Sequence, residues 1–194
     1  MSASTLFQAV AGERLSPTAE ALPTPVPTFA ELYDLSFDFV WRSARRLGVA
    51  EAHIDDVVQE VFMVVHRRLD EFEGRSSLKT WLFGITRRVV GDYHRSARRK
   101  PTESLGERVL IAGDQDPEQR YAALQGQALL HAVLAELDLD KREVFVLAEL
   151  EEMSGPEIAQ ALDLNLNTMH ARLRAARRDF EHILARRARA RRSP

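Results

Sequence analysis

The sequence predicts an all-α protein in which a flexible linker joins two small helical domains. Apolar residues recur every three or four positions through most of the chain, which is the spacing of one face of an α-helix. Short turns separate these periodic stretches, and a polar segment at residues 101–116 divides them into two groups. A chain of 194 residues can bury one or two modest cores, so two small domains are favoured.

The N-terminal part of the chain changes character at about residue 29. Residues 1–28 contain four prolines and little that could form a buried face, which predicts a disordered tail. Residues 29–47 then show helical spacing and stop before Gly48. The apolar face of this first helix is expected to carry Leu32, Leu35, Phe39, Val40 and Ala44.

A second helix is predicted from Ile54 onward. Val57, Val61 and Val65 recur every four residues, with Val58 and Phe62 beside them, so the apolar face is wide enough to pack on both flanks. The other face of this helix is acidic and polar; it carries Asp55, Asp56, Gln59 and Glu60.

A third helix, aromatic and basic, follows after a short loop. Gly74 permits a turn in this loop, and Ser76 or Ser77 can cap the helix by accepting a backbone N–H bond. The apolar stripe of the helix is expected to comprise Leu78, Leu82, Ile85 and Val89. Its other sides are expected to carry Lys79, Trp81, Phe83, Arg87 and Arg88.

The charge is distributed unevenly, although the net charge is only −2. Residues 75–100 hold eight Lys or Arg against one acid, and residues 170–192 hold nine Arg against two acids, so each stretch carries +7. The rest of the chain is acidic. Two separate sites for a polyanion are therefore predicted, with weak binding of DNA by the unassisted chain.

The second domain is expected to span residues 117–185, after the linker at 101–116. Asp116 can cap its first helix, and Pro117 is favoured in a first turn. Leu129, Val133 and Leu137 define the core side of this helix. Two further helices are predicted to begin with capping boxes, formed by Asp140 with Glu143 and by Ser154 with Glu157.

A helix-turn-helix is predicted at residues 155–174. Asn165 ends a tight turn and can cap a long last helix. The buried stripe of that helix is expected to comprise Met169, Leu173, Ala176, Phe180 and Ile183. Polar and basic residues lie off this stripe, so the second helix presents an exposed polar face, and residues 186–194 form a basic tail.

Two stretches of the chain resemble a known family. The run from Ile54 to Lys100, an acidic helix, a Phe-Gly loop, an S-L-K-T-W-L helix and a D-Y-H-R basic end, resembles region 2 of extracytoplasmic function (ECF) sigma factors of the sigma-70 family. The run REVFVLAELEEMSGPEIAQALDLNLNTMHARLRAARRDF resembles region 4 of the same subfamily. The resemblance implies that residues 29–100 and 117–185 form these two domains.

Sigma factors of this kind bind core RNA polymerase, direct it to promoters and assist strand opening. Carried over residue by residue, the resemblance assigns core-polymerase binding to Asp55, Asp56, Gln59, Glu60 and Phe62. It assigns the minus-ten element to Phe72, Gly74, Ser76, Lys79, Trp81, Arg87, Arg88, Tyr93 and Arg95. It assigns the minus-thirty-five element to Asn165, Asn167, Thr168, His170, Arg172, Arg174 and Arg177. The family commonly has Asn where Arg88 stands, so base preference can differ here.

The physical character of these residues is compatible with strand opening. The sequence has no G-x-x-x-x-G-K-[ST] motif, so opening is expected to come from the capture of unstacked bases and not from ATP hydrolysis. An aromatic and Arg surface stabilises each captured base by about 1–3 kcal/mol.

One alternative is a stand-alone helix-turn-helix regulator that binds an operator. This alternative explains residues 126–185 but gives no function to the acidic helix or to the Phe-Gly loop. An enzyme is a weaker alternative, since the six histidines are scattered and the chain has no cysteine. We therefore expect no catalytic activity, metal or cofactor. The expected partners are core RNA polymerase, promoter DNA and an anti-sigma factor, and the expected location is the cytoplasm because no signal or membrane-spanning run is present.

Overall fold

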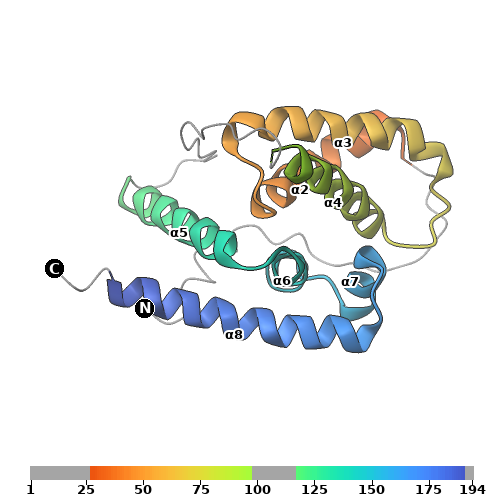
Figure 1. Cartoon of the computed structure of the whole chain (residues 1–194). Coiled ribbons are helices and arrows are strands. Elements are labelled where there is room, and N and C mark those ends of the chain that lie inside the picture. Colours follow the sequence, from red (N-terminus) through yellow and green to blue (C-terminus); the bar gives the residue numbers. More distant parts are fainter. Residues whose placement is uncertain (1–26, 98–116, 191–194) are drawn as a thin grey trace.

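The computed structural model describes residues 27–97 and 117–190 (Figure 1). Within those ranges all regular secondary structure is helical, which confirms the predicted fold class. The predicted disordered tail, except for its last two residues, and the predicted linker lie outside the described residues. The last helix continues past residue 185 to Ala190, into the segment expected to be a basic tail.

The first half of the molecule is a bundle of three helices, α2 (Phe29–Arg46), α3 (Ile54–Arg68) and α4 (Leu78–Ala97). Short 3-10 helices at Glu51–His53 and Leu69–Glu71 connect them. Helix α2 begins with a capping box, in which Glu31 accepts from the Thr28 backbone N–H at 2.8 Å. It ends at Arg46, and Gly48 follows the C-cap residue Leu47 with a φ of +94°, the left-handed conformation that glycine adopts without strain.

Two predictions for this half were wrong. Leu35 was expected on the buried face of α2, but its side chain is 77% exposed, and the buried face includes Ser36 and Ser43 instead. Phe83 was expected on the exposed side of α4, but it is fully buried. Helix α4 packs against α2 and α3 and also against α7 of the second half, so it buries a broader face than its apolar stripe alone indicated.

The second half comprises α5 (Pro117–Glu136), α6 (Leu139–Phe145), α7 (Gly155–Leu162) and α8 (Leu166–Ala190). A π-helical turn at Val146–Leu150 extends α6. The expected stripe of α8 is confirmed, because all of its members are buried: Met169, Leu173, Ala176, Phe180 and Ile183. Figure 1 shows α8 running along one side of the molecule, with α5, α6 and α7 between it and the three-helix bundle.

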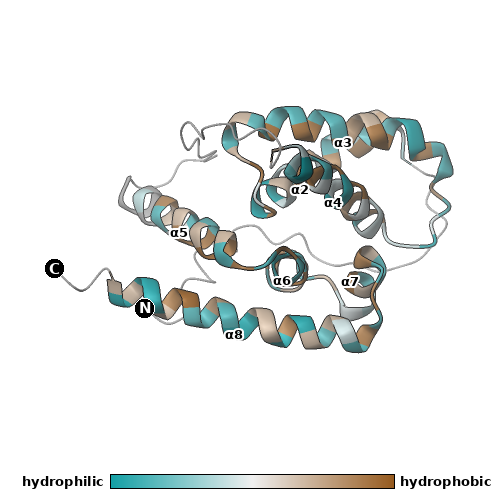
Figure 2. Ribbon diagram, in the orientation of Figure 1, coloured by the Kyte–Doolittle hydropathy of each residue, from teal (hydrophilic) through white to brown (hydrophobic). Residues whose placement is uncertain are grey.

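Two hydrophobic clusters hold the structure together. The larger cluster joins the two halves: it combines the apolar faces of α2, α3 and α4 with side chains of α6, α7 and α8, among them Val144, Ile158 and Met169. The smaller cluster lies within the second half, around Val133, Phe145 and Phe180. The rings of Phe145 and Phe180 are stacked, with centroids 4.5 Å apart. The hydropathy colouring in Figure 2 shows apolar residues alternating with hydrophilic residues along the helices.

Candidate nucleic-acid interface

The loop before α4 and the first turn of this helix form one end of the candidate surface. Ser77 caps the helix, since its Oγ accepts from the Thr80 backbone N–H at 3.2 Å, which confirms one of the two predicted caps. Phe72 and Trp81 lie side by side, with ring centroids 5.2 Å apart. Gly74 has a φ of +68°, and a Cβ added to it would have no neighbouring atom within 4 Å. The loop and the first turn of α4 thus bring two aromatic rings together beside an uncrowded turn.

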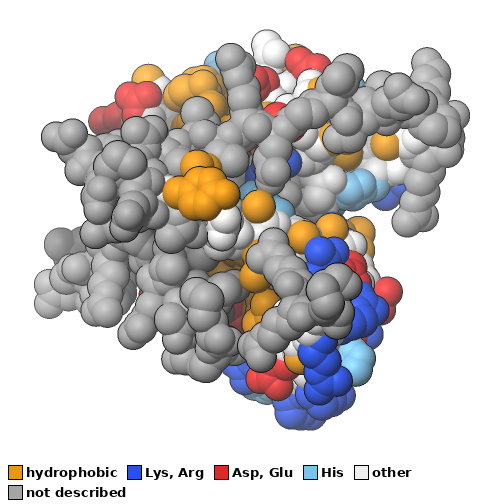
Figure 3. Space-filling model, turned by 90° about the vertical axis from the view of Figure 1, so that its left-hand side faces the viewer, with side chains coloured by type: hydrophobic (Ala, Val, Ile, Leu, Met, Phe, Trp, Pro, Cys, Tyr) orange, Lys and Arg blue, Asp and Glu red, His pale blue; other side chains and the backbone are white. Residues whose placement is uncertain are grey.

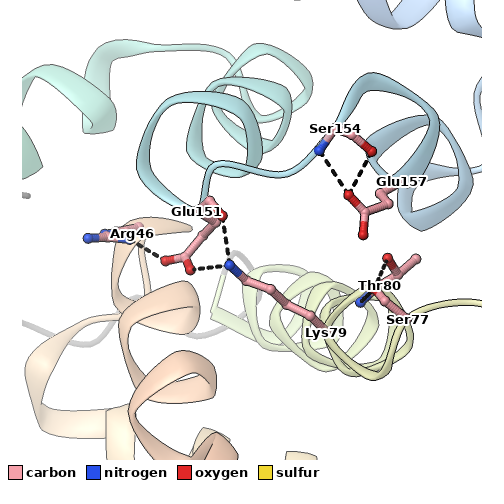
Figure 4. A network of polar contacts seen from close by, with 7 residues as sticks. All are labelled: Arg46, Ser77, Lys79, Thr80, Glu151, Ser154 and Glu157. Atoms are coloured by element: carbon pink, nitrogen blue, oxygen red, sulfur yellow. Dashed lines mark hydrogen bonds and ion pairs between the residues drawn. The ribbon is translucent and has the colours of Figure 1, made fainter. Parts of the chain in front are cut away.

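Two cations of α4 face the second half of the molecule. The Lys79 Nζ lies 3.2 Å from Oε2 of Glu151 and donates to the Glu151 backbone oxygen at 2.7 Å. The same carboxylate also pairs with Arg46 of α2, so it lies between two cations (Figure 4). Arg87 Nε donates to Oε1 of Glu143 at 2.8 Å. These two predicted DNA-binding residues are therefore occupied by carboxylates of the second half.

The remaining minus-ten candidates have varied surroundings. Arg88 and Arg95 are both exposed. Arg95 also pairs with Asp92 on the same helix. Tyr93 is half-buried and its hydroxyl accepts from the Ala50 backbone N–H at 3.3 Å, so it also connects α4 to the segment between α2 and α3. Ser76 is half-buried.

The helix-turn-helix has the predicted local geometry. Glu157 accepts from the Ser154 backbone N–H at 2.9 Å, which confirms the second capping box. Asp163 adopts the left-handed conformation, with a φ of +54°, and Asn165 Oδ1 accepts from the Thr168 N–H at 2.8 Å, which confirms the predicted cap. A Cβ on Gly155 would lie 2.9 Å from Cε of Met169, so this glycine permits the close approach of α7 and α8.

The first part of α8 presents the polar residues that the sequence placed off its stripe. Asn165, Asn167, His170, Arg174 and Arg177 are exposed. Thr168 and Arg172 are half-buried. Arg172 pairs with Asp140 at 3.1 Å and Arg177 with Glu149 at 2.6 Å, and both acids belong to the second half. In Figure 3 Lys and Arg side chains gather at the lower end of the molecule, at the level of α8 in Figure 1.

The polar face of α3 lies open. Its four polar candidates are exposed: Asp55, Asp56, Gln59 and Glu60. Phe62 differs, since it is 4% exposed and therefore supports this face from within. It lines an open apolar groove between α2 and α3 together with Phe29, Tyr33 and Met63.

The electrostatics of the contact between the halves are shaped by burial. Burial raises the pKa of the Glu143 carboxyl, against the opposing effect of Arg87. Burial also lowers the pKa of Arg46, and Glu151 offsets this effect in part. His131 of α5 lies near Arg45 and Arg46, and burial followed by these two charges lowers its pKa to about 4.

Sequence reasoning missed the acidic members of this contact. Asp140 and Glu143 were predicted to form a capping box, but α6 begins at Leu139 and Asp138 is its N-cap residue. Glu143 instead turns inward, is 3% exposed and pairs with Arg87 of the other half. No local pattern distinguishes a capping glutamate from one that pairs with a residue 56 positions away.

The described residues contain no group of three or more His, Cys, Asp or Glu that could hold a metal ion. No helix in residues 27–97 and 117–190 is both long and apolar enough to cross a membrane.

Comparisons with known proteins identify the two halves. The family described as sigma-70 region 2 matches residues 32–100, and the family described as sigma-70, region 4 matches residues 127–180. The chain is 33% identical to the RNA polymerase sigma factor CnrH of Cupriavidus metallidurans over 151 residues, which are 74% of this chain and 79% of CnrH. It is 33% identical to the ECF RNA polymerase sigma factor SigC of Mycobacterium tuberculosis over 142 residues, or 71% and 73% of the two chains.

Solved structures agree with this assignment. The structure of CnrH in complex with the cytosolic domain of CnrY matches with a TM-score of 0.62 and 26% identity, and the match covers 93% of this chain and 96% of that one. The match to region 2 excludes the alternative of a stand-alone helix-turn-helix regulator, because that alternative gives the first half of the chain no function. The chain therefore belongs to the ECF subfamily of the sigma-70 family, and it is an RNA polymerase sigma factor that directs promoter-specific initiation of transcription.

Proposed function

We propose that this sigma factor divides promoter recognition among three surfaces. The exposed polar face of α3 binds core RNA polymerase, the loop 71–77 with α4 captures the minus-ten element, and the first part of α8 reads the minus-thirty-five element. The domains extend over residues 29–100 and 117–185, with a linker at 101–116. One observation supports this proposal: the three surfaces lie on different helices. The surface on α3 is acidic, the surface on α4 is aromatic and basic, and the surface on α8 is polar and basic.

The proposed polymerase-binding surface is acidic, and its charged side chains are exposed and take no part in the hydrophobic core. Asp56 and Glu60 are one helical turn apart on α3 and both are exposed, while the buried face of the helix is apolar. A protein partner that presents basic residues suits such a face. Phe62 contributes to this surface indirectly, because its buried ring lines the apolar groove between α2 and α3.

The minus-ten surface combines aromatic rings with cations. The pair Phe72 and Trp81 offers faces on which unpaired bases can stack, and each stacked base contributes about 1–3 kcal/mol. The exposed Arg88 can contact phosphates. This surface would stabilise separated strands, and no nucleotide-driven or other catalytic step is required of the chain.

The minus-thirty-five surface is a helix N-terminus with polar side chains. Arg174 and His170 are exposed on the first turns of α8, where a major-groove reader carries its base contacts. Arg174 can bond guanine or phosphate, and each good bidentate base contact discriminates by about 1–3 kcal/mol.

We also propose cytoplasmic action, because core RNA polymerase is there, and regulation by an anti-sigma factor. The relative CnrH has been solved in complex with the cytosolic domain of CnrY, and the match to this structure covers nearly all of both sigma chains.

The polymerase surface is tested by exchanging charge on α3. Asp56→Arg with Glu60→Arg should abolish binding to core RNA polymerase in gel filtration, because two attractive charges become repulsive. The melting temperature should stay nearly unchanged, since both side chains lie off the apolar stripe. Asp34→Arg with Asp38→Arg, on the α2 helix, is the matched control and should retain binding.

A double mutant that still co-elutes with polymerase would remove α3 from the interface. Transcription in vitro with core polymerase and genomic DNA, followed by sequencing of the transcripts, would define the promoters that the factor reads.

A further inference from the structure

The apolar groove between α2 and α3 has a volume of about 710 Å³ and is open to water. Its aromatic rings contact one another, and the rings of Tyr33 and Phe62 have centroids 4.6 Å apart. All of its lining residues belong to α2 or α3, and α3 lies on the side of the molecule away from α8 (Figure 1). The groove is therefore a feature of the first half alone. Its apolar lining comprises Phe29, Tyr33, Phe37, Val58, Phe62 and Met63.

Several of these apolar side chains face water. Met63 is 54% exposed and Tyr33 is 38% exposed, while Phe29 and Phe37 are half-buried. Apolar surface that is gathered in a groove with a polar rim is typical of a binding site and not of scattered surface residues. A groove between two helices is suited to the apolar face of a third, short helix.

The two ends of the groove carry opposite charge. Asp55, in the first turn of α3, lines one end, and Arg67, in its last turn, lines the other. Phe29, the first residue of α2, lies at the Arg67 end, because its ring centroid is 4.8 Å from that of His66. The chain that precedes α2 therefore arrives at the basic end of the groove.

The sequence of the N-terminal tail contains one short stretch that matches this groove. Leu6, Phe7 and Val10 are spaced as on one face of a helical turn. Thr5 with Gln8 three residues later is the pattern of a capping box ahead of them. An isolated helix of this length is not stable in water, so such a segment becomes helical only against a surface that covers its apolar face.

The lengths agree as well. The groove follows α2 from Phe29 to Phe37, which is eight helical steps or about 12 Å, and residues 5–13 would cover the same length as a helix. Residues 14–28 join this segment to α2. At about 3.3 Å per residue they can span up to about 50 Å, so the segment can reach every part of the groove.

The charges select one orientation. A docked helix that runs from the Asp55 end to the Arg67 end places the positive end of its dipole beside the carboxylate. Glu13 then lies at the end that carries Arg67. The connecting residues also leave the groove where Phe29 begins α2, so the same orientation satisfies the connection.

A docked segment would cover part of the proposed polymerase-binding surface. Asp55 and Gln59 line the groove and also belong to the exposed polar face of α3. The segment and core RNA polymerase are therefore alternative partners for the same side chains, and binding of one weakens binding of the other.

We propose that residues 5–13 of the N-terminal tail occupy the groove between α2 and α3 in the free sigma factor, and that core RNA polymerase displaces them when it binds α3. A short connection gives an effective concentration in the millimolar range, so a segment with a separate dissociation constant of about 0.1 mM fills the groove about nine-tenths of the time. The competition with polymerase rests on the proposed function of α3, but the docking itself is measured without polymerase.

Docking is measured through a thiol in the groove of a chain that has no native cysteine. Met63→Cys places a single thiol there, and its rate of reaction with a fluorescent maleimide reports how often the groove is open. Leu6→Asp with Phe7→Asp in the same background should speed this reaction by about tenfold, because the segment no longer covers the thiol. Leu22→Asp with Val26→Asp is the matched control, since it adds the same charge to the tail outside the segment. The control should react as slowly as the chain with the natural tail.

The competition is measured with the full chain, with Met63 retained, and core RNA polymerase. Leu6→Asp with Phe7→Asp should bind the polymerase about tenfold more tightly than the wild type, because the competing segment has been removed from the groove. Leu22→Asp with Val26→Asp should bind like the wild type.

Equal thiol reactivity in the chains with the natural and the Leu6→Asp, Phe7→Asp tails would overturn the proposal. Equal acceleration by the two Asp pairs would also count against it, since added charge alone would then explain the effect. Protection that increases with protein concentration would show that a second copy of the chain, and not the tail of the same chain, covers the groove. If the segment protects the thiol but polymerase affinity does not change, docking stands and the assignment of α3 to polymerase fails.

Discussion

The two candidate DNA surfaces neutralise their cations in different ways. On α4 the partners belong to the other half of the chain; the pairs are Lys79–Glu151 and Arg87–Glu143. On α8 the partners belong to the same half; the pairs are Arg172–Asp140 and Arg177–Glu149. Separation of the halves therefore removes the carboxylates from α4 but leaves those on α8 in place. Only the minus-ten surface depends on how the two halves sit.

The largest effect should come from breaking the packing behind the α4 surface. Phe83→Ala should lower the free energy of unfolding by about 3–5 kcal/mol, because a fully buried phenyl ring leaves a cavity in the cluster that joins the halves. It should also increase the radius of gyration of the folded chain, measured by small-angle X-ray scattering.

Phe180→Ala is the matched change, since Phe180 lies in the cluster confined to the second half. It should destabilise by a similar amount in chemical denaturation but leave the radius of gyration of the folded chain unchanged. A similar expansion in both variants would contradict the distinction between the clusters.

The next largest effects should separate strand opening from duplex recognition. Phe72→Ala should weaken transcription from closed duplex by about 1–3 kcal/mol of lost base stacking, and Arg88→Ala should weaken it through a lost contact to DNA. A template with a pre-melted bubble should largely restore transcription in both variants. Arg172→Ala and Arg174→Ala should lose preference for the upstream element by about 1–3 kcal/mol per good contact, and the bubble should not restore it.

Run-off transcription with the four variants on matched duplex and bubble templates measures this difference. Equal rescue of both pairs would mean that the two surfaces do not divide the work, and strand opening could no longer be assigned to residues 71–95.

A smaller effect should appear on acidification. His131 lies near Arg45 and Arg46, and its pKa in the folded state is about 4 against an ordinary 6.5. Between these values the unfolded state binds more protons, so stability should fall as the pH falls, by at most about 1.4 kcal/mol per pH unit. The raised pKa of Glu143 acts in the opposite direction, since burial of its carboxyl favours the protonated form and stability is lost as the pH rises through this raised pKa.

Comparison of the wild type with His131→Gln isolates the histidine from Glu143. In urea denaturation at a series of pH values, the variant should show the weaker loss of stability from pH 6.5 downward. Parallel pH profiles for the two proteins would show that His131 is already solvated.

The smallest effects should be equal in the two halves. Thr28→Ala and Ser154→Ala each remove the hydroxyl of a capping box, and each should cost about 1 kcal/mol in thermal unfolding. Caps act within one helix, so the two losses should be independent of the contact between the halves and additive in the double variant. A loss that exceeds the sum would indicate that Ser154 also supports the contact between the halves.

Local features of this fold could be predicted because short-range chemistry determines them. The stripe of α8 follows from its spacing alone, and the caps at Ser154 and Asn165 follow from the residues one turn ahead. The exposed acidic face of α3 was also predictable, since it is the complement of a strongly apolar one.

Features that depend on contact between the halves could not be predicted in this way. Glu143 satisfies the sequence rule for a capping box, but the cation it pairs with lies on another helix, so tertiary structure overrides the local preference. The wrong prediction for Phe83 has the same cause. A single amphipathic stripe predicts one buried face, whereas α4 packs against α2 and α3 on one side and against α7 on the other. For the same reason, the resemblance that assigned Lys79 and Arg87 to DNA did not reveal their carboxylate partners.

The π-helical turn at Val146–Leu150 has a consequence for the position of Glu151. A π turn holds one residue more than an α-helical turn, and each residue advances a helix by about 100°. The Glu151 backbone N–H accordingly donates to the Val146 oxygen at 3.0 Å, five positions back. The extra residue therefore lies in the turn that leads directly to Glu151, the residue that pairs with Arg46 and Lys79 of the first half.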